Sequence, residues 1–213
     1  MFAYLTCNRH RSVRRAELID AIWPDPPAAA DSALNALVSK LRRVLGSSTI
    51  EGRSSLRMRL DNAWVDIESA GEAVHRAESA VAVGDWARAW GPSLVALITA
   101  EREFLPDHDT PWVNHERARL GDIHLRALET YATCCVGIGG TELVAGVRVG
   151  RELVRLAPLH ERGHQLLMRA LAAQGNVAEA LRVYTNLCAT LRDELGVPPC
   201  AATRAIHDQL LTA

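Results

Sequence analysis

A row of polar and cationic side chains runs from residue 32 to residue 43, in step with leucines at helical spacing. Placing successive residues about 100° apart puts the leucines on one face of a helix. The opposite face and its flanks then carry Ser32, Asn35, Ser39, Lys40, Arg42 and Arg43. Small side chains let a helix backbone enter the major groove of DNA, where Asn and Arg bond base edges. The spacing therefore predicts a helix that contacts double-stranded DNA.

A second basic group follows this helix after a Gly/Ser turn. Residues 55–60 alternate polar and apolar side chains, the pattern of a half-buried strand, so Arg57 and Arg59 share its outer face. With Arg53 in the preceding turn, they predict a ribbon that contacts a phosphate backbone or a minor groove. The alternative is a charged edge strand that protects the sheet from aggregation.

The charge of the chain is unevenly distributed. Residues 1–60 carry ten Lys/Arg and five Asp/Glu, whereas residues 61–213 carry fourteen and twenty. Only the first part is expected to approach a polyanion, because basic side chains near phosphates release condensed counterions. Sampling noise in a short segment is the alternative explanation.

The composition is that of a folded protein without a membrane segment. A hydrophobic content of 48% excludes wholesale disorder, and apolar stretches such as 94–100 are far shorter than the roughly 20 residues of a membrane helix. No leader peptide is recognised at the start of the chain. Five cysteines without a C-x-x-C pair favour a reducing cytoplasm.

The residues around the basic helix predict its ends. Asp31 or Ser32 supplies an N-cap oxygen, the helix runs to Leu45, and Gly46 is expected in the left-handed conformation after it. A preceding helix is predicted over residues 14–23, where prolines stop it. The buried face of the basic helix is expected to comprise Leu34, Leu37, Val38, Leu41 and Leu45.

From Asp66 onward the pattern is that of consecutive helices. Short connections between helices of similar length indicate stacked antiparallel hairpins. The last hairpin places Gly175, Ala180 and Tyr184 where a tetratricopeptide repeat has its turn glycine, its small packing residue and its aromatic residue. The expected helices are 67–83, 85–100 with a break at Gly91-Pro92, 112–135, 141–156, 161–174, 177–195 and 201–211.

Two further motifs suggest chemistry. His160 to His164 satisfies H-E-x-x-H, which in zinc hydrolases places two imidazoles one helical turn apart beside a carboxylate. Gly163 loosens that helix and the positions also fit a repeat helix, so a solvated helix edge is expected instead. Cys134 and Cys135 are expected to pack as small apolar residues. The sequence therefore predicts no catalytic residue, metal site or cofactor, and no enzyme.

Six blocks of the chain are similar to parts of one family: residues 15–24, 35–46, 111–120, 166–171, 179–184 and 193–199. The first two resemble the second and third helices of an OmpR-type winged helix, and the others resemble a helical bacterial transcriptional activator domain. Together they resemble the Streptomyces antibiotic regulatory protein (AfsR-like) family of transcriptional activators.

This resemblance implies a mainly α fold, a truncated winged helix-turn-helix followed by a tetratricopeptide-like repeat domain. Residues 1–62 would be a winged-helix DNA-binding domain lacking its N-terminal sheet, and residues 63–213 the activator domain. Carried over by position, the base-facing residues would be Ser32, Asn35, Ser39 and Arg43, and those serving phosphates Lys40, Arg42, Arg53, Arg57 and Arg59.

The implied partners are promoter DNA, RNA polymerase through residues 23–27, and further copies of the chain through the repeat domain. A rigid proline turn is the alternative for residues 23–27. The implied function is that of a cytoplasmic DNA-binding regulator. The alternative is a helical-repeat module that binds no DNA and docks another regulator.

Overall fold

The computed structural model describes residues 1–212, which divide into two compact units. The N-terminal unit consists of Met1–Glu68 and Glu103–Arg119, and the helical unit of Ser69–Arg102 and the residues from Leu120 on. No helix within residues 1–212 combines the length and the apolar character that a membrane crossing requires.

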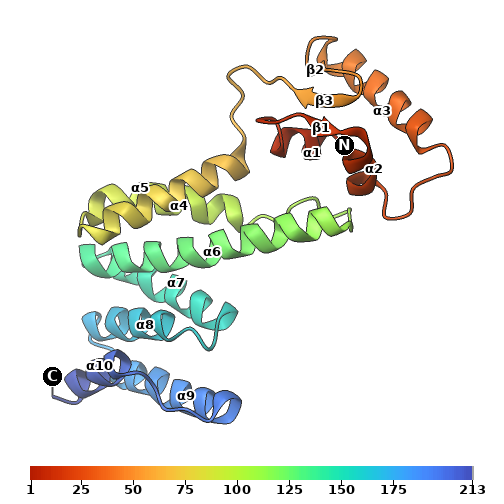
Figure 1. Ribbon diagram of the computed structural model, residues 1–213. Coiled ribbons are helices and arrows are strands. Elements are labelled where there is room, and N and C mark those ends of the chain that lie inside the picture. Colours follow the sequence, from red (N-terminus) through yellow and green to blue (C-terminus); the bar gives the residue numbers. More distant parts are fainter. Residues whose placement is uncertain (213) are drawn as a thin grey trace. The chain divides into compact units, whose positions relative to one another are not determined.

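The N-terminal unit combines short helices with a small sheet (Figure 1). Its strands pair in the antiparallel order β1-β3-β2, with Val13 opposite Leu56 and Ile50 opposite Met58. The sequence does not predict β1, because two residues are too few to show an alternating pattern. The elements from residue 1 to residue 58 are α1 (Phe2–Cys7), β1 (Val13–Arg14), α2 (Arg15–Ile22), α3 (Ala30–Leu45), β2 (Ile50–Glu51) and β3 (Ser55–Met58).

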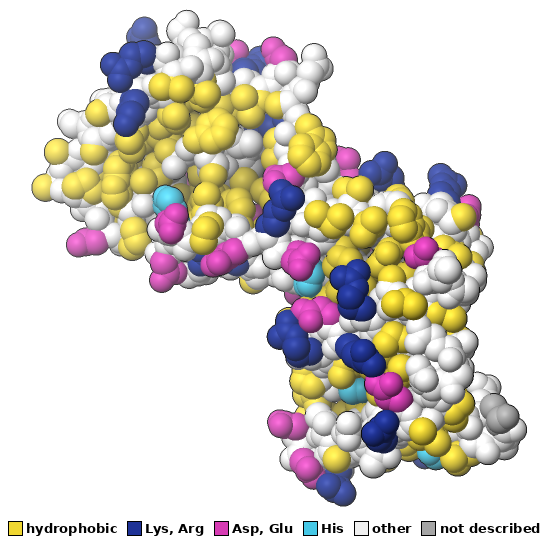
Figure 2. All heavy atoms as spheres, turned by 180° about the vertical axis from the view of Figure 1, so that it is seen from behind, with side chains coloured by type: hydrophobic (Ala, Val, Ile, Leu, Met, Phe, Trp, Pro, Cys, Tyr) yellow, Lys and Arg dark blue, Asp and Glu magenta, His cyan; other side chains and the backbone are white. Residues whose placement is uncertain are grey.

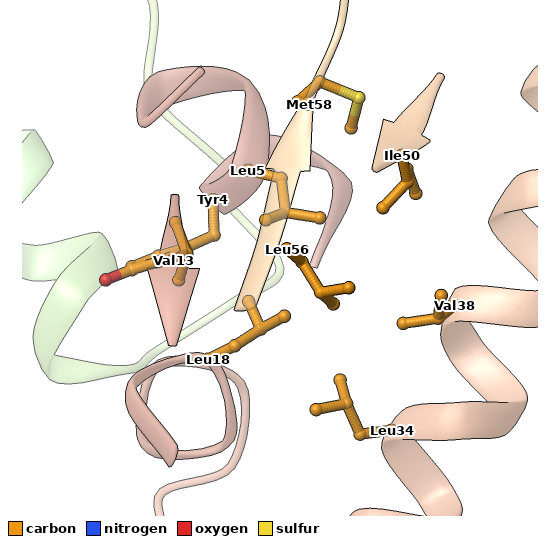
Figure 3. Close-up of a cluster of buried hydrophobic side chains, with 9 residues drawn as sticks. All are labelled: Tyr4, Leu5, Val13, Leu18, Leu34, Val38, Ile50, Leu56 and Met58. Atoms are coloured by element: carbon orange, nitrogen blue, oxygen red, sulfur yellow. The ribbon is translucent and has the colours of Figure 1, made fainter. Parts of the chain in front are cut away.

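All of these elements contribute to one apolar core (Figure 3). Leu5 of α1, Leu18 of α2 and Leu34 of α3 are all 0% exposed and belong to this core. The inner faces of α2 and α3 are therefore covered by α1 and by β3. The members of the cluster are Tyr4, Leu5, Val13, Leu18, Leu34, Val38, Ile50, Leu56 and Met58.

A carboxylate ties α1 to α2. Tyr4 Oη donates to Glu17 Oε1 over 2.7 Å, and Arg11 pairs with the same carboxylate. The hydrogen bond from Arg11 is the main reason why the pKa of Glu17 falls to about 2. Since the folded pKa is depressed, this contribution to stability is present above the ordinary carboxyl pKa and is lost as the pH falls towards 2.

The helical unit is a succession of helices (Figure 1). The predicted spans agree with the observed ones to within three residues at each end. The predicted break at Gly91-Pro92 is wrong: α5 is continuous, and buried Ala89 and Ala96 anchor it on both sides of the proline. The helices from residue 66 on are α4 (Asp66–Ala82), α5 (Trp86–Ala100), α6 (Pro111–Ile138), α7 (Glu142–Leu156), α8 (Glu161–Ala173), α9 (Val177–Leu195) and α10 (Ala201–Thr212).

The last hairpin, α8 with α9, confirms the repeat spacing. Gly175 has a φ of 82°, a left-handed conformation that favours glycine, in the turn between the two helices. Ala180 is 0% exposed in a core cluster shared by α7 to α10, and Tyr184 packs against that cluster. Tyr184 also stacks on His207 of α10, with ring centroids 4.0 Å apart.

Adjacent cysteines in α6 are packing residues, as predicted. Cys134 and Cys135 are both 0% exposed. Burial raises the pKa of Cys134 to about 11 and that of Cys135 to about 12. Both thiols therefore stay protonated at neutral pH, which makes them poor nucleophiles.

Glycines let α7 and α8 approach closely. A Cβ atom at Gly163 would lie 2.9 Å from Cγ of Leu153, which is itself 0% exposed. A Cβ atom at Gly150 would lie 3.2 Å from Cβ of Leu167. Gly163 is thus a contact residue of the helix pair rather than a loosening element.

We expect Gly163→Ala to lower the stability of the helical unit by about 1–3 kcal/mol, because the added methyl group overpacks the contact with Leu153. Thermal unfolding followed by circular dichroism measures this. Gly121→Ala in α6 is the control: its Cβ atom meets nothing within 4 Å, so it is expected to stabilise by up to about 1 kcal/mol. Equal stabilisation by both variants would contradict the close contact.

Candidate nucleic-acid interface

Helix α3 has one buried side and one exposed side. Leu34 and Val38 are buried, while Leu37 and Leu41 are half-buried. Leu45, predicted to be buried, is 37% exposed. The exposed side carries Ser32, Asn35, Ser39, Lys40 and Arg43. This exposure is what a DNA contact requires, and the contact itself stays a prediction.

The ends of α3 differ in part from the predicted ones. The helix begins at Ala30 with Ala29 as its N-cap, so the predicted cap by Asp31 or Ser32 is wrong. Asp31 lies in the first turn, where a carboxylate favours the positive end of the helix dipole. Gly46 has the predicted positive φ, 102°, but its ψ of 146° is not that of the left-handed helix.

The wing consists of residues 50–58, that is, β2, β3 and the turn between them. Its turn needs glycine at position 52, where φ is 92° and a Cβ atom would lie 2.0 Å from the carbonyl oxygen of Ser55. Arg53 follows in this turn and is exposed. The predicted strand 55–60 ends two residues early, at Met58.

Three of the arginines predicted to serve phosphates have partners within the chain. Arg42 donates from Nε and one terminal nitrogen to the carbonyl oxygen of Ile50, over 3.0 and 2.9 Å, and also to that of Gly52. Arg57 Nε donates to the carbonyl oxygen of Arg9 over 3.3 Å. Arg59 pairs with Glu51 over 3.0 Å, and both side chains are half exposed. Arg42 therefore attaches the wing to α3.

Two arginines outside the predicted set also hold this unit together. Arg9 forms a two-pronged ion pair with Glu68, through nitrogen–oxygen distances of 3.2 and 2.6 Å, and donates to the carbonyl oxygen of Ala63. Arg15, at the start of α2, donates to Asn35 of α3. No periodic pattern reveals them, because their partners lie between 16 and 59 residues away.

The residues of the H-E-x-x-H pentapeptide, 160–164, make contacts inside the helical unit. His164 is 4% exposed and its Nε2 lies 2.9 Å from the carbonyl oxygen of Pro158, so the expectation of a solvated edge is wrong for this residue. Glu161 accepts hydrogen bonds from the backbone N–H of Cys200 and from Thr203 Oγ1, which attaches α8 to α10. Within residues 1–212 no three His, Cys, Asp or Glu side chains are grouped as metal ligands.

Comparison with known sequences identifies the family to which this chain belongs. The sequence pattern described as "Bacterial transcriptional activator domain" matches residues 65–211, well over half of the chain. The chain belongs to the bacterial transcriptional activator domain family. A second pattern, "Transcriptional regulatory protein, C terminal", matches residues 1–55, which contain α3. Together with the 32% identity to AfsR proteins of two Streptomyces species, these matches confirm the AfsR-like resemblance expected from the sequence.

The relatives of this chain are named as regulatory proteins. The regulatory protein AfsR of Streptomyces griseus is 32% identical over 98% of this chain and 22% of its own length. The transcriptional regulator RedD of Streptomyces coelicolor is 28% identical over 99% of this chain and 63% of its own length. The chain thus spans only part of each relative.

A solved structure confirms the fold class. Mycobacterium tuberculosis EmbR, in complex with a low affinity phosphopeptide, matches 99% of this chain and 57% of its own chain with a TM-score of 0.85. The sequence identity is 24%, so this likeness concerns the fold alone. It supports the expected mainly α architecture of the family, with a small sheet near the start of the chain.

Proposed function

We propose that the chain binds double-stranded promoter DNA and acts in the cytoplasm as a transcriptional activator. The observation that carries this proposal is the sidedness of α3: Leu34 and Val38 are buried, while Asn35, Ser39 and Arg43 are exposed. A helix with such a face fits a major groove. The family match and the regulatory names of the relatives support the same function.

Within this proposal the predicted residues have different roles. Ser32, Asn35, Ser39 and Arg43 face the bases. Lys40, Arg53 and Arg59 are exposed and are suited to phosphates, and Arg57 lies deeper on the same ribbon. Arg42 acts through the wing, since its donors are engaged by the carbonyl groups of Ile50 and Gly52. The function needs no catalytic residue, metal or cofactor.

Loss of sequence preference in Arg43→Ala tests the base-facing role. We first select preferred duplexes from a random library with the wild-type protein and then measure affinities by fluorescence anisotropy. Arg43→Ala is expected to weaken binding of the preferred duplex about 5- to 100-fold, the range for a specific base contact, and binding of random duplex much less.

Arg182→Ala is the matched control, because Arg182 is an exposed arginine on α9 in the helical unit, outside α3 and the sheet that contains the wing. Equal losses for the two variants would show only general attraction between charges. No binding of any duplex by the wild-type protein at low salt would overturn the proposal.

Exposed apolar side chains on the helical unit support a second function, the docking of another protein. Val95 and Ile98 on α5 are 45% and 48% exposed, and Val83 and Ile138 are also exposed. Figure 2 shows hydrophobic side chains gathered over the α4 to α6 part of this unit. Exposed apolar surface of this kind is typical of protein contacts. If DNA binding fails, a module that docks another regulator is the remaining function.

Self-association and contact with RNA polymerase are the finer parts of the proposal. The prolines of the loop before α3, Pro24, Pro26 and Pro27, are all exposed, as a polymerase contact requires. The apolar surface of α5 is suited to a second copy. Sedimentation equilibrium of the wild-type protein and of Ile98→Asp tests self-association, and an unchanged mass distribution would exclude α5 as its surface.

A further inference from the structure

A cavity of about 220 Å³ lies among α5, α6 and α7 of the helical unit. Each helix contributes one apolar side chain to its lining: Leu97 is 8% exposed, Leu128 is 2% exposed and Val149 is 3% exposed. The cavity therefore combines apolar and charged surface, because polar side chains complete its lining: Glu101, His124, Arg148 and Glu152.

Contacts outside the cavity fix the helices that form it. Trp90 of α5 donates from Nε1 to a carboxylate oxygen of Glu142, in the first turn of α7, over 3.1 Å. A Cβ atom at Gly146 of α7 would lie 3.0 Å from Cβ of Cys135, so α6 and α7 approach each other closely. The cavity is thus held open by packed helices, and binding sites for small molecules are usually preformed in this way.

Several polar groups of the lining lack partners in the protein. Arg148 and Glu101 are exposed, and neither forms an ion pair within residues 1–212. Nδ1 of His124 is buried and has no hydrogen-bond partner among those residues. A buried nitrogen without a partner costs free energy, so such a group calls for an explanation. A molecule in the cavity supplies partners for all three side chains, and for the imidazole it does so after a rotation of the ring.

The charged groups suit a molecule that carries both an ammonium group and a carboxylate. A guanidinium group has N–H donors only and pairs with carboxylates through two parallel hydrogen bonds, so Arg148 fits the carboxylate. Ionised carboxylates only accept, which matches the three donors of an ammonium group, so Glu101 fits that end. Glu152, which also pairs with Arg155 over 2.5 Å, adds a second carboxylate to the lining.

The volume and the aliphatic side chains define the rest of the ligand. An apolar protein cavity of about 150 Å³ takes up benzene, which corresponds to about 25 Å³ for each carbon atom. At this ratio the cavity accommodates roughly nine non-hydrogen atoms, the size of leucine or isoleucine. We infer that the cavity is a binding site for a free aliphatic amino acid of this size. The site belongs to the helical unit alone and does not depend on DNA binding.

Isothermal titration calorimetry of the full chain with L-leucine tests the inference. Saturable binding with a Kd of about 1 mM or lower is expected for a ligand of this size. Two analogues each lack one charged group: 3-methylbutylamine has no carboxylate, and 4-methylpentanoate has no ammonium group. Each should bind at least about tenfold more weakly. L-Alanine leaves the apolar lining uncovered and should also lose about tenfold or more.

Substitutions in the lining show whether this cavity is the site. Arg148→Met and Glu101→Gln each remove one charge from an exposed side chain, so both variants should fold, which circular dichroism checks. Each should weaken binding of L-leucine about 10- to 100-fold, the range for a hydrogen bond to a charged group. Arg169→Met is the matched control, because Arg169 is an exposed arginine of α8 outside the cavity lining, and its Kd should equal that of the wild type.

The inference is wrong if the wild type shows neither saturable heat nor a higher unfolding temperature with L-leucine at about 10 mM, roughly ten times the highest expected Kd. It is also wrong if both analogues bind as tightly as L-leucine, because the charged groups then select nothing. Wild-type affinity in Arg148→Met and Glu101→Gln, or the same loss in Arg169→Met, would place the binding outside this cavity and overturn the inference as well.

Discussion

Binding of duplex DNA is expected to weaken about a hundredfold between 50 and 200 mM salt. The exposed cations of α3, of the wing and of the residue directly after it provide roughly four charges within reach of phosphates: Lys40, Arg43, Arg53 and Arg59. Each releases about 0.9 of a counterion. The logarithm of the binding constant should therefore fall against the logarithm of salt with a slope of about −3 to −4. Anisotropy titrations at several salt concentrations measure this slope.

Variants that each remove one positive charge show which surface causes the salt dependence. Arg53→Gln should reduce the magnitude of the slope by about one and weaken binding equally for all sequences. Arg182→Gln, which removes an exposed arginine of α9, should leave the slope unchanged. A wild-type slope near zero, or the same change in both variants, would mean that α3 and the wing are not the DNA-binding surface.

Leu34→Ala is expected to destabilise the N-terminal unit by about 2–5 kcal/mol, because it leaves a cavity among side chains of α2, α3 and β3 that are 0–4% exposed. Small units have only about 5–15 kcal/mol of stability in total. The variant should therefore lose a large share of the stability of this unit and unfold at a clearly lower denaturant concentration than the wild type. Chemical denaturation followed by fluorescence of the unit's tryptophans measures the loss.

Leu45→Ala makes the same chemical change on the same helix at a position that is 37% exposed. It is expected to lower stability by only about 1 kcal/mol, because part of the side chain is in solvent and no closed cavity is left. Similar losses from the two variants would contradict the sidedness of α3 on which the proposed function depends.

The span of α3 and its exposed face were predictable because they follow from neighbours in the sequence. Leu34, Val38 and Leu41 recur every three or four residues, and this spacing alone separates an apolar face from a polar one. The helices of the helical unit were predictable for the same reason. The N-cap of α3 was not predictable in this way, because the sequence offers Asp31 and Ser32 as caps and the helix begins before both, at Ala30.

The roles of the arginines required the tertiary structure. Arg42 and Arg43 are adjacent and equally cationic in the sequence. Only the position of β2 directs Arg42 to the carbonyl groups of the wing and leaves Arg43 exposed. Periodicity predicts the face on which a side chain lies, but not the backbone oxygen that a distant strand brings to it.

The sequence by itself determined the helical character, the apolar face of α3 and the basic part of the chain, since these depend on residue type and local spacing. The tertiary structure decided that Gly163 is a contact residue, that Arg42 attaches the wing, and that Arg15 donates a hydrogen bond to Asn35. These depend on atoms brought together from distant parts of the chain, and short hydrogen bonds and close contacts are set by that packing rather than by sequence neighbours.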